Sequence, residues 1–183
     1  SLDVNLAIAS EREKIKLFCE SFYSGKIKGI TGKEIQHIVN IGIGGSSIGP
    51  DFVTDALKDY RKTDLSFHFL DSIDGAGLKE LLDKIDLEHS LFIVVSKTFT
   101  TLETMTNASL IKDLLIEHLG PKSLKQHLIA VTTDALKAEE FGVTPDNIFL
   151  FWDWVCGRFS LASSVGLVVA LSIGYEQFEA FLK

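Results

Sequence analysis

Short, almost wholly apolar segments recur along this chain, and a helical pattern follows each one. The clearest is LFIVV at residues 91–95, with a long helical stretch over residues 102–119 behind it. Strands with so few polar positions are typical of a sheet that is buried on both faces. Strands of four to six residues that alternate with helices indicate βαβ units. The chain is therefore predicted to be an α/β protein, a doubly wound, three-layer αβα sandwich with a five-stranded parallel sheet.

The remaining predicted elements follow the same alternation. The other strands are expected at residues 37–41, 67–70, 127–132 and 148–151. Helices are expected at residues 4–23, 50–60, 78–85, 135–141 and 161–183. In such folds the ligand binds at the carboxyl ends of the strands, so functional residues are expected in the loops that follow them.

The length and composition indicate one globular domain. The 183 residues suffice for a sizeable core, and 46% hydrophobic with 23% charged residues is ordinary for a globular protein. No internal repeat and no linker rich in proline or serine divides the chain. We expect a single domain over residues 1–183, in which residues 1–35 form a leading helix and loop and residues 36–183 form the αβα core.

Charge and cysteine content narrow the possible partners. A formal net charge of −7 argues against a nucleic-acid partner, although one small phosphate can still be held by backbone N–H groups. Cys19 and Cys156 form no C-x-x-C pair, which favours a reducing compartment, the cytoplasm. Residues 1–9 lack a signal-peptide pattern, and the apolar run at residues 161–173 is too short to span a membrane. We therefore expect no membrane partner.

The loop after the first strand has the composition of an anion site. Three glycines, Gly42, Gly44 and Gly45, let the backbone approach a ligand closely, and the start of the next helix directs free N–H groups at the same place. Ser47 stands where a dinucleotide fingerprint needs glycine, and no G-K-[ST] follows for a Walker A loop. The alternative is a plain glycine-rich turn in which Ser46 or Ser47 caps the helix.

The loop after the third strand is rich in hydroxyl groups. Residues 96–104 read SKTFTTLET, which places five hydroxyls and one lysine at the end of the most apolar strand. Hydroxyl and N–H groups can hold phosphate oxygens without several cations. Thr100 and Glu103 also have the spacing of a capping box, which accounts for those two residues alone. The sequence therefore favours a second phosphate-binding loop.

Three stretches carry a more specific signal than the loops alone. They are NIGIGGSSIGP at residues 40–50, SKTFTTLETMTNA at residues 96–108 and FWDWVCGRFSLASSVGL at residues 151–167. In this order they resemble signature stretches of the glucose-6-phosphate isomerase family, and shorter matches extend the resemblance over nearly the whole chain. It implies a sugar-isomerase (SIS) domain from an enzyme of glycolysis and gluconeogenesis. Such enzymes interconvert glucose 6-phosphate and fructose 6-phosphate by proton transfer through an enediolate.

The resemblance also implies roles for particular residues. Arg158 is the implied catalytic residue, because a fixed cation stabilises the developing enediolate; its alternative role is a structural salt bridge. Glu103 is given a supporting role, and no metal or cofactor is expected. The implied partner is a small sugar phosphate, held by Gly45, Ser46, Ser96, Lys97, Thr98, Phe99, Thr100 and Thr101.

Departures from the family pattern bear on activity. Ser47, Cys156, Phe159 and Ala162 replace the usual aspartate, glycine, tyrosine and tryptophan. The family's catalytic glutamate, histidine and lysine lie in later segments, so we expect residues 1–183 alone to lack the catalytic base. The rest of the enzyme is then an expected partner, and a homodimer is expected for the full enzyme.

Two other functions remain open from the sequence. One is a nucleotide-binding oxidoreductase domain, which Asp71 supports because it ends the second strand, where a ribose-binding acid would lie. The other is a non-catalytic sugar-phosphate sensor, which would share the two loops but would not be expected to carry the stretch at residues 151–167.

Overall fold

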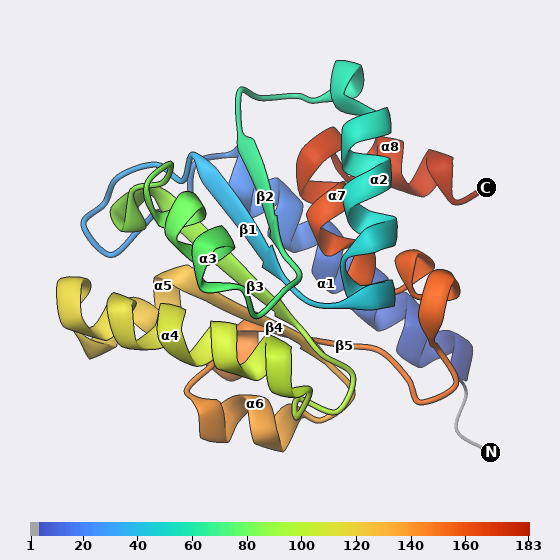
Figure 1. Cartoon of the computed structure of the whole chain (residues 1–183). Helices are drawn as coiled ribbons and strands as arrows, with labels where there is room; N and C mark the ends of the chain where they lie inside the picture. The colour runs from blue at the N-terminus through green and yellow to red at the C-terminus, as the bar shows by residue number, and fades with distance from the viewer. Residues whose placement is uncertain (1–3) are drawn as a thin grey trace.

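Within residues 4–183, the part of the chain that the computed structural model describes, five parallel strands form the central layer (Figure 1). Their order in the sheet is β2-β1-β3-β4-β5, so β1 and β3 lie side by side in the middle. The strands are β1 (His37–Ile41), β2 (Ser66–Leu70), β3 (Ser90–Val95), β4 (Leu128–Thr132) and β5 (Ile148–Leu150). This confirms the predicted α/β fold with a five-stranded parallel sheet.

Helices cover both faces of the sheet. One face packs against α1 (Val4–Tyr23), α2 (Ile48–Ala56), α7 (Leu167–Ile173) and α8 (Tyr175–Phe181). The other packs against α3 (Gly75–Leu82), α4 (Leu102–Leu119), α5 (Leu124–His127) and α6 (Ala135–Phe141). Short 3₁₀ turns, among them η1 (Gly44–Ser46), η5 (Pro145–Asn147) and η6 (Gly157–Ala162), lie in the connections.

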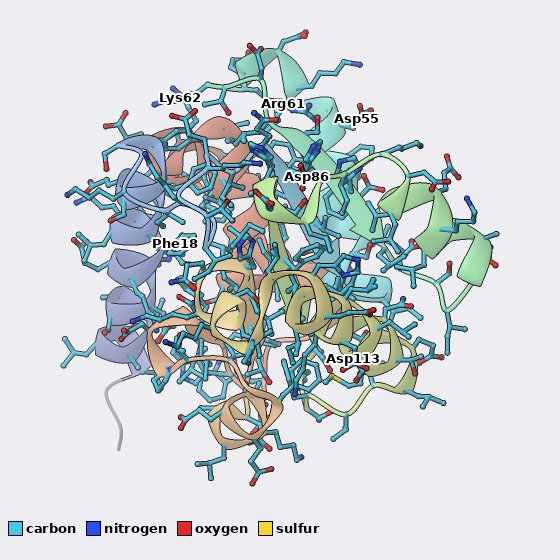
Figure 2. The ribbon with its side chains drawn as sticks, turned by 90° about the vertical axis from the view of Figure 1, so that its left-hand side faces the viewer. Phe18, Asp55, Arg61, Lys62, Asp86 and Asp113 are labelled. Atoms are coloured by element: carbon cyan, nitrogen blue, oxygen red, sulfur yellow. The ribbon has the colours of Figure 1, made fainter. Side chains whose placement is uncertain are left out.

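Alternation along the strands explains the layers. Ile93 and Val95 of β3 pack into the apolar cluster under α1 and α7, while Phe92 and Val94 pack into the cluster under α4. All six residues of β3 are buried, and every residue of α7 is buried as well. Figure 2 shows α1 along one side of the molecule, with Phe18 pointing inward toward the sheet.

The structure corrects several predicted boundaries. The helix expected at residues 50–60 spans Ile48–Ala56, and a 3₁₀ turn follows it at Lys58–Tyr60. Residues 161–183 are not one helix, because Gly174 has φ 86°, outside the right-handed helical region, and separates α7 from α8. The helix expected at residues 78–85 begins earlier, at Gly75, because the carboxylate of Asp74 accepts a hydrogen bond from the N–H of Ala76 and caps it. The predictions for residues 1–9 and 1–183 begin on residues 1–3, which lie outside the described part.

Among residues 4–183, no helix combines the length and the apolar character that crossing a bilayer requires.

A buried histidine attaches the loop after α1 to the amino end of the sheet. The Nε2 atom of His127 accepts a hydrogen bond from the N–H of Ile30 at 2.9 Å, and its Nδ1 atom lies 2.7 Å from the carbonyl oxygen of Ser90. A neutral ring with its proton on Nδ1 satisfies both contacts. Burial is the main cause that lowers the pKa of His127, and burial likewise lowers the pKa values of His37 and His68.

We predict that mild acid destabilises the chain through these histidines. Their lowered pKa values mean that the folded state prefers the neutral rings. In the unfolded chain these histidines take up protons near pH 6.5. Their contribution to the free energy of unfolding is therefore fully present above that pH and is lost as the pH falls below it. Urea unfolding should therefore show a lower midpoint at pH 5.5 than at pH 7.5.

Paired variants identify the contribution of His127. His127→Gln should reduce the difference between the two pH values, whereas His118→Gln, on the exposed end of α4, should leave it unchanged. An undiminished difference in His127→Gln would contradict the assignment.

Candidate functional site

Parallel strands bring the loops after β1 and β3 to the same edge of the sheet. Ile41 pairs with Val94 across the two strands, so Gly42 follows β1 beside the end of β3. A Cβ atom built on Gly42 would lie 3.1 Å from the carbonyl oxygen of Val95. The two loops that the sequence singles out therefore begin next to each other.

The first loop is shaped by its own backbone and by a buried amide. Gly44 has φ 58°, and the side-chain Nδ2 of Asn40 donates a hydrogen bond to the carbonyl oxygen of Ser46 at 3.0 Å. Ser47 occupies the N-cap position of α2 but its side chain makes no capping hydrogen bond. The capping role considered for Ser47 is therefore wrong, while Gly45 and Ser46 remain half-buried at the edge.

In the second loop the hydroxyls pair with one another. Ser96 Oγ lies 3.1 Å from Thr101 Oγ1, and Thr98 Oγ1 lies 2.7 Å from Thr100 Oγ1. Thr101, not Thr100, is the N-cap residue of α4, so the predicted capping box of Thr100 and Glu103 is wrong. Thr98 and Thr100 are exposed, and the N-terminal end of the 18-residue helix α4 adds positive potential here.

The buried side chain of Phe99 anchors the second loop to the core. Among the described residues it is the one non-glycine residue with a positive φ, 52°. Its ring is buried and packs edge-on against Phe141, with 5.7 Å between the ring centroids. A left-handed backbone costs about 1–3 kcal/mol, which the buried ring offsets. The side chain is therefore committed to the core, and only the backbone of Phe99 is placed to meet a ligand.

Lys97 connects the second loop to its neighbours. Its carbonyl oxygen accepts hydrogen bonds from the hydroxyl of Thr132 and from the hydroxyl and N–H of Thr133. Its ammonium group donates to the carbonyl oxygen of Asp153, in the stretch that follows β5. The lysine side chain therefore bridges two of the three signature stretches.

The third stretch also contacts the first loop. Ser160 Oγ, in η6, donates to the carbonyl oxygen of Gly45 at 3.1 Å and lies 2.8 Å from that of Gly157. A Cβ atom at Gly45 would lie only 2.6 Å from the carbonyl oxygen of Gly157, so the two backbones touch. Residues 151–160 thus bridge the first loop and the second.

Arg158 is exposed in this bridge. Its guanidinium lies over the ring of Phe159, 4.7 Å from the centroid. No carboxylate of residues 4–183 comes within ion-pair distance of it, so the alternative role in a structural salt bridge is wrong for the described part of the chain. The charge of Arg158 is consequently available to a ligand.

The other titratable candidates contribute less. Glu103 lies half-buried in the first turn of α4, and its carboxylate makes no hydrogen bond or ion pair within residues 4–183. His37, His89 and His127 lie at the opposite, amino end of the strands. The structure therefore keeps these histidines away from the three signature stretches.

Sequence reasoning missed the residues that position the loops. Asn40, Asp153 and Ser160 act through the contacts described above, and the side chain of Asn107 donates to the carbonyl oxygen of Ser72 at 2.7 Å in the loop after β2. One signal was visible, since an asparagine inside the apolar run HIVNI must find a partner when buried.

The edge is open rather than a closed pocket. Thr98, Thr100 and Arg158 are all exposed at this edge. A cavity of about 150 Å³ lies nearby, and Phe159 and Ala162, two of the departures from the family pattern, line it. Trp152 and Trp154 also line it and stack with 5.8 Å between ring centroids.

Comparisons with known proteins agree on one family. The family model described as phosphoglucose isomerase matches residues 2–183. The chain is 47% identical over 182 residues to a glucose-6-phosphate isomerase of Chlorobium phaeobacteroides, covering 99% of this chain and 33% of that protein. It thus spans about a third of the length of this curated relative.

Solved structures give the same picture. A glucose-6-phosphate isomerase from Chlamydia trachomatis superposes with a TM-score of 0.75 at 34% identity, over 97% of this chain and 33% of that one. A hypothetical protein from Thermus thermophilus superposes with a TM-score of 0.73 at 26% identity, over 96% of this chain and 43% of that one. The comparisons give no support to the oxidoreductase or sensor alternatives.

We predict that the contact between Gly45 and Gly157 is essential to the shape of the edge. Gly45→Ala should lower the free energy of unfolding by about 1–3 kcal/mol, because the added methyl group meets backbone that cannot yield. Gly49→Ala is the matched control, since nothing lies within 4 Å of its Cβ position in α2. It should be neutral or stabilising by up to about 1 kcal/mol. Equal urea midpoints for the two variants would refute the contact.

Proposed function

The chain belongs to the phosphoglucose isomerase family, and from this we propose that residues 1–183 form the part of such an enzyme that binds its sugar-phosphate substrate. The observation that carries the proposal is the bridge at the carboxyl edge. Ser160 contacts Gly45 while Lys97 contacts Asp153, so the three signature stretches form one surface.

The second loop is suited to the phosphate end of the substrate. Within residues 4–183, the hydroxyls of Ser96, Thr98 and Thr101 pair only with other hydroxyls. They can therefore turn toward phosphate oxygens without leaving a charged partner behind. The N–H groups at the start of α4 add donors and a favourable dipole. We assign the 6-phosphate to Ser96–Thr101 as a set: Ser96, Lys97, Thr98, Phe99, Thr100 and Thr101, with Phe99 acting through its backbone.

The first loop and Arg158 are suited to the sugar end. Gly45 and Ser46 contact the sugar, and the exposed guanidinium of Arg158 lies in the stretch that packs on Gly45. Isomerisation removes a proton next to a carbonyl group and leaves negative charge on the oxygens of an enediolate. A fixed cation lowers the energy of that charge where it develops. Glu103, beside the phosphate loop, takes a supporting role.

The activity of the whole protein extends this proposal. We propose that it interconverts glucose 6-phosphate and fructose 6-phosphate, that the base moving the proton between C1 and C2 comes from outside residues 1–183, and that the full enzyme is a homodimer. The expected compartment is the cytoplasm. The free thiols of Cys19 and Cys156 fit a reducing compartment.

We predict that hydroxyl groups of the second loop carry phosphate binding. The chain should bind fructose 6-phosphate weakly, in the millimolar range of about −4 kcal/mol, because the edge is open to water. Thr98→Ala combined with Thr101→Ala should weaken binding by about a hundredfold or more, since each of the two hydrogen bonds to a charged group is worth about 1.5–3 kcal/mol. Titrations followed by amide NMR shifts measure both affinities.

The matched control is Thr106→Ala in α4. The hydroxyl of Thr106 already donates a hydrogen bond to the carbonyl oxygen of Leu102. This variant should bind as the parent does. Equal affinity of the double variant and the control would remove the phosphate assignment. A parallel titration with NADH should show no saturable shift, and saturation there would favour a nucleotide site.

We predict that residues 1–183 alone do not isomerise glucose 6-phosphate at a useful rate. General acid–base catalysis supplies about 10²–10⁴-fold, and this contribution requires a positioned base. A coupled assay on the purified chain tests this, with mass spectrometry to exclude a longer isomerase. Turnover on the order of 10 per second would show that a carboxylate of this chain, Glu103 first, performs the proton transfer.

A further inference from the structure

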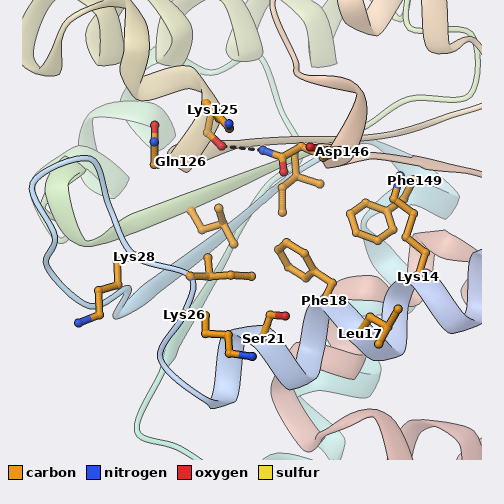
Figure 3. A pocket seen from close by; sticks show the side chains of 14 residues that line it. Lys14, Leu17, Phe18, Ser21, Lys26, Lys28, Lys125, Gln126, Asp146 and Phe149 are labelled. Carbon is orange, nitrogen blue, oxygen red and sulfur yellow. Dashed lines mark hydrogen bonds between the residues drawn. The ribbon is translucent and has the colours of Figure 1, made fainter.

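A larger cavity lies at the amino end of the sheet, at the opposite end of the strands from the candidate site (Figure 3). It lies between α1 and the first residues of β3, β4 and β5, and its volume is about 400 Å³. Its rim is formed by α5, by η5 and by the loop after α1. A volume of this size suits a small organic ligand.

The floor of the cavity is apolar. Phe18 of α1 and Phe149 of β5 meet edge-on with 5.3 Å between ring centroids, and Leu91 and Ile129 complete the floor from β3 and β4. Leu17 lies at the mouth with 53% of its surface exposed. An apolar ring would bury surface here that water now meets, and burial stabilises by about 25 cal/mol per Å².

The rim is positively charged. Lys26, Lys28 and Lys125 line it, and none of them forms an ion pair with a carboxylate of residues 4–183. Lys14 adds a fourth cation, held by a 2.6 Å hydrogen bond to the carbonyl oxygen of Ile148. Asp146 is the single carboxylate among the described lining residues. A gathering of unpaired cations on a chain of net charge −7 favours an anion.

Gln126 and Asn147 form part of the wall. The side-chain Oε1 atom of Gln126 is buried and receives no hydrogen bond from residues 4–183. The neighbouring amide of Asn147 is already committed to the carbonyl oxygens of Lys125 and Leu128. This oxygen has almost no accessible surface, so it is a cost within the fold and not a contact for a ligand in the cavity.

We propose that this cavity is a second binding site, for a small amphipathic anion that joins an apolar ring system to a phosphate, sulfonate or carboxylate. The ring packs on Phe18 and Phe149, and the anionic group meets Lys26 and Lys125. A sugar phosphate lacks the apolar body, so the site is distinct from the proposed substrate site in chemistry as well as in position.

The probe that matches this description is 1-anilinonaphthalene-8-sulfonate, which has fused rings and a sulfonate. The 183-residue chain should bind it at a single saturable site, and amide NMR shifts should concentrate on Phe18, Ser21, Ile27 and Gln126. N-phenyl-1-naphthylamine, which lacks the sulfonate, measures the contribution of the rings alone. Fructose 6-phosphate should not displace either probe.

Charge variants test the rim. Lys26→Gln combined with Lys125→Gln should weaken binding of the sulfonate by about fivefold to tenfold, because each exposed charge is worth up to about 1 kcal/mol. Binding of the neutral probe should not change. The control, Lys79→Gln combined with Lys84→Gln, makes the same change in net charge in α3 and the turn that follows it, across the sheet, and should leave both affinities unchanged.

A space-filling variant tests the floor. Leu17→Trp places a larger side chain at a mouth that is already exposed, so the fold should tolerate it, and binding of both probes should fall together. The proposal is overturned if the rim and floor variants leave sulfonate binding unchanged, or if the amide shifts concentrate around Trp152 and Trp154 instead. Neither result bears on the phosphate loop, whose failure would appear only in the fructose 6-phosphate titration.

Discussion

The parallel pairing of β1 with β3 is the interaction on which the candidate site depends. These strands are separated along the chain by α2, β2 and α3, yet they lie side by side at the centre of the sheet. The Gly42 turn and the Ser96 loop therefore start a single strand spacing apart, about 4.8 Å. Alternate residues of both strands pack into the two apolar clusters, so a one-residue slip would exchange these side chains between the clusters and disrupt the packing of both. The position at which each loop begins is therefore fixed.

The stretch after β5 turns two adjacent loops into one surface. It contacts the first loop through Ser160 and receives the ammonium group of Lys97 from the second. Both contacts use backbone carbonyl oxygens as acceptors, so they constrain the path of the chain and leave other side chains free. Arg158 is one of those, presented between the two contacts without a carboxylate partner among residues 4–183. A local sequence window contains none of this arrangement.

The sheet, its order of elements and the edge that carries function could be predicted, because period and apolar runs report burial directly. The bounds of α1, α4 and α6 agree with the predicted ones. Helix capping was harder to predict. The hydroxyls around Thr101 can bond either to backbone N–H groups or to one another, and only the folded loop determines which of these bonds forms. Gly174 was read as part of a helix because apolar residues continue on both sides of it. The substrate roles of Ser46 and Thr98 remain predictions.

The conformation of the second loop depends on the core contact of Phe99. Its backbone adopts a conformation that its own residue type disfavours, and the edge-on contact with Phe141 of α6 keeps it there. The residues that meet a ligand therefore do not encode their own geometry. Transplanting residues 96–101 onto another scaffold would carry the hydroxyls without the curve that presents them. Conversely, substitutions in the core beneath α6 would change the conformation of the loop even if residues 96–101 stayed the same. The loop and the core that supports it therefore have to be kept together.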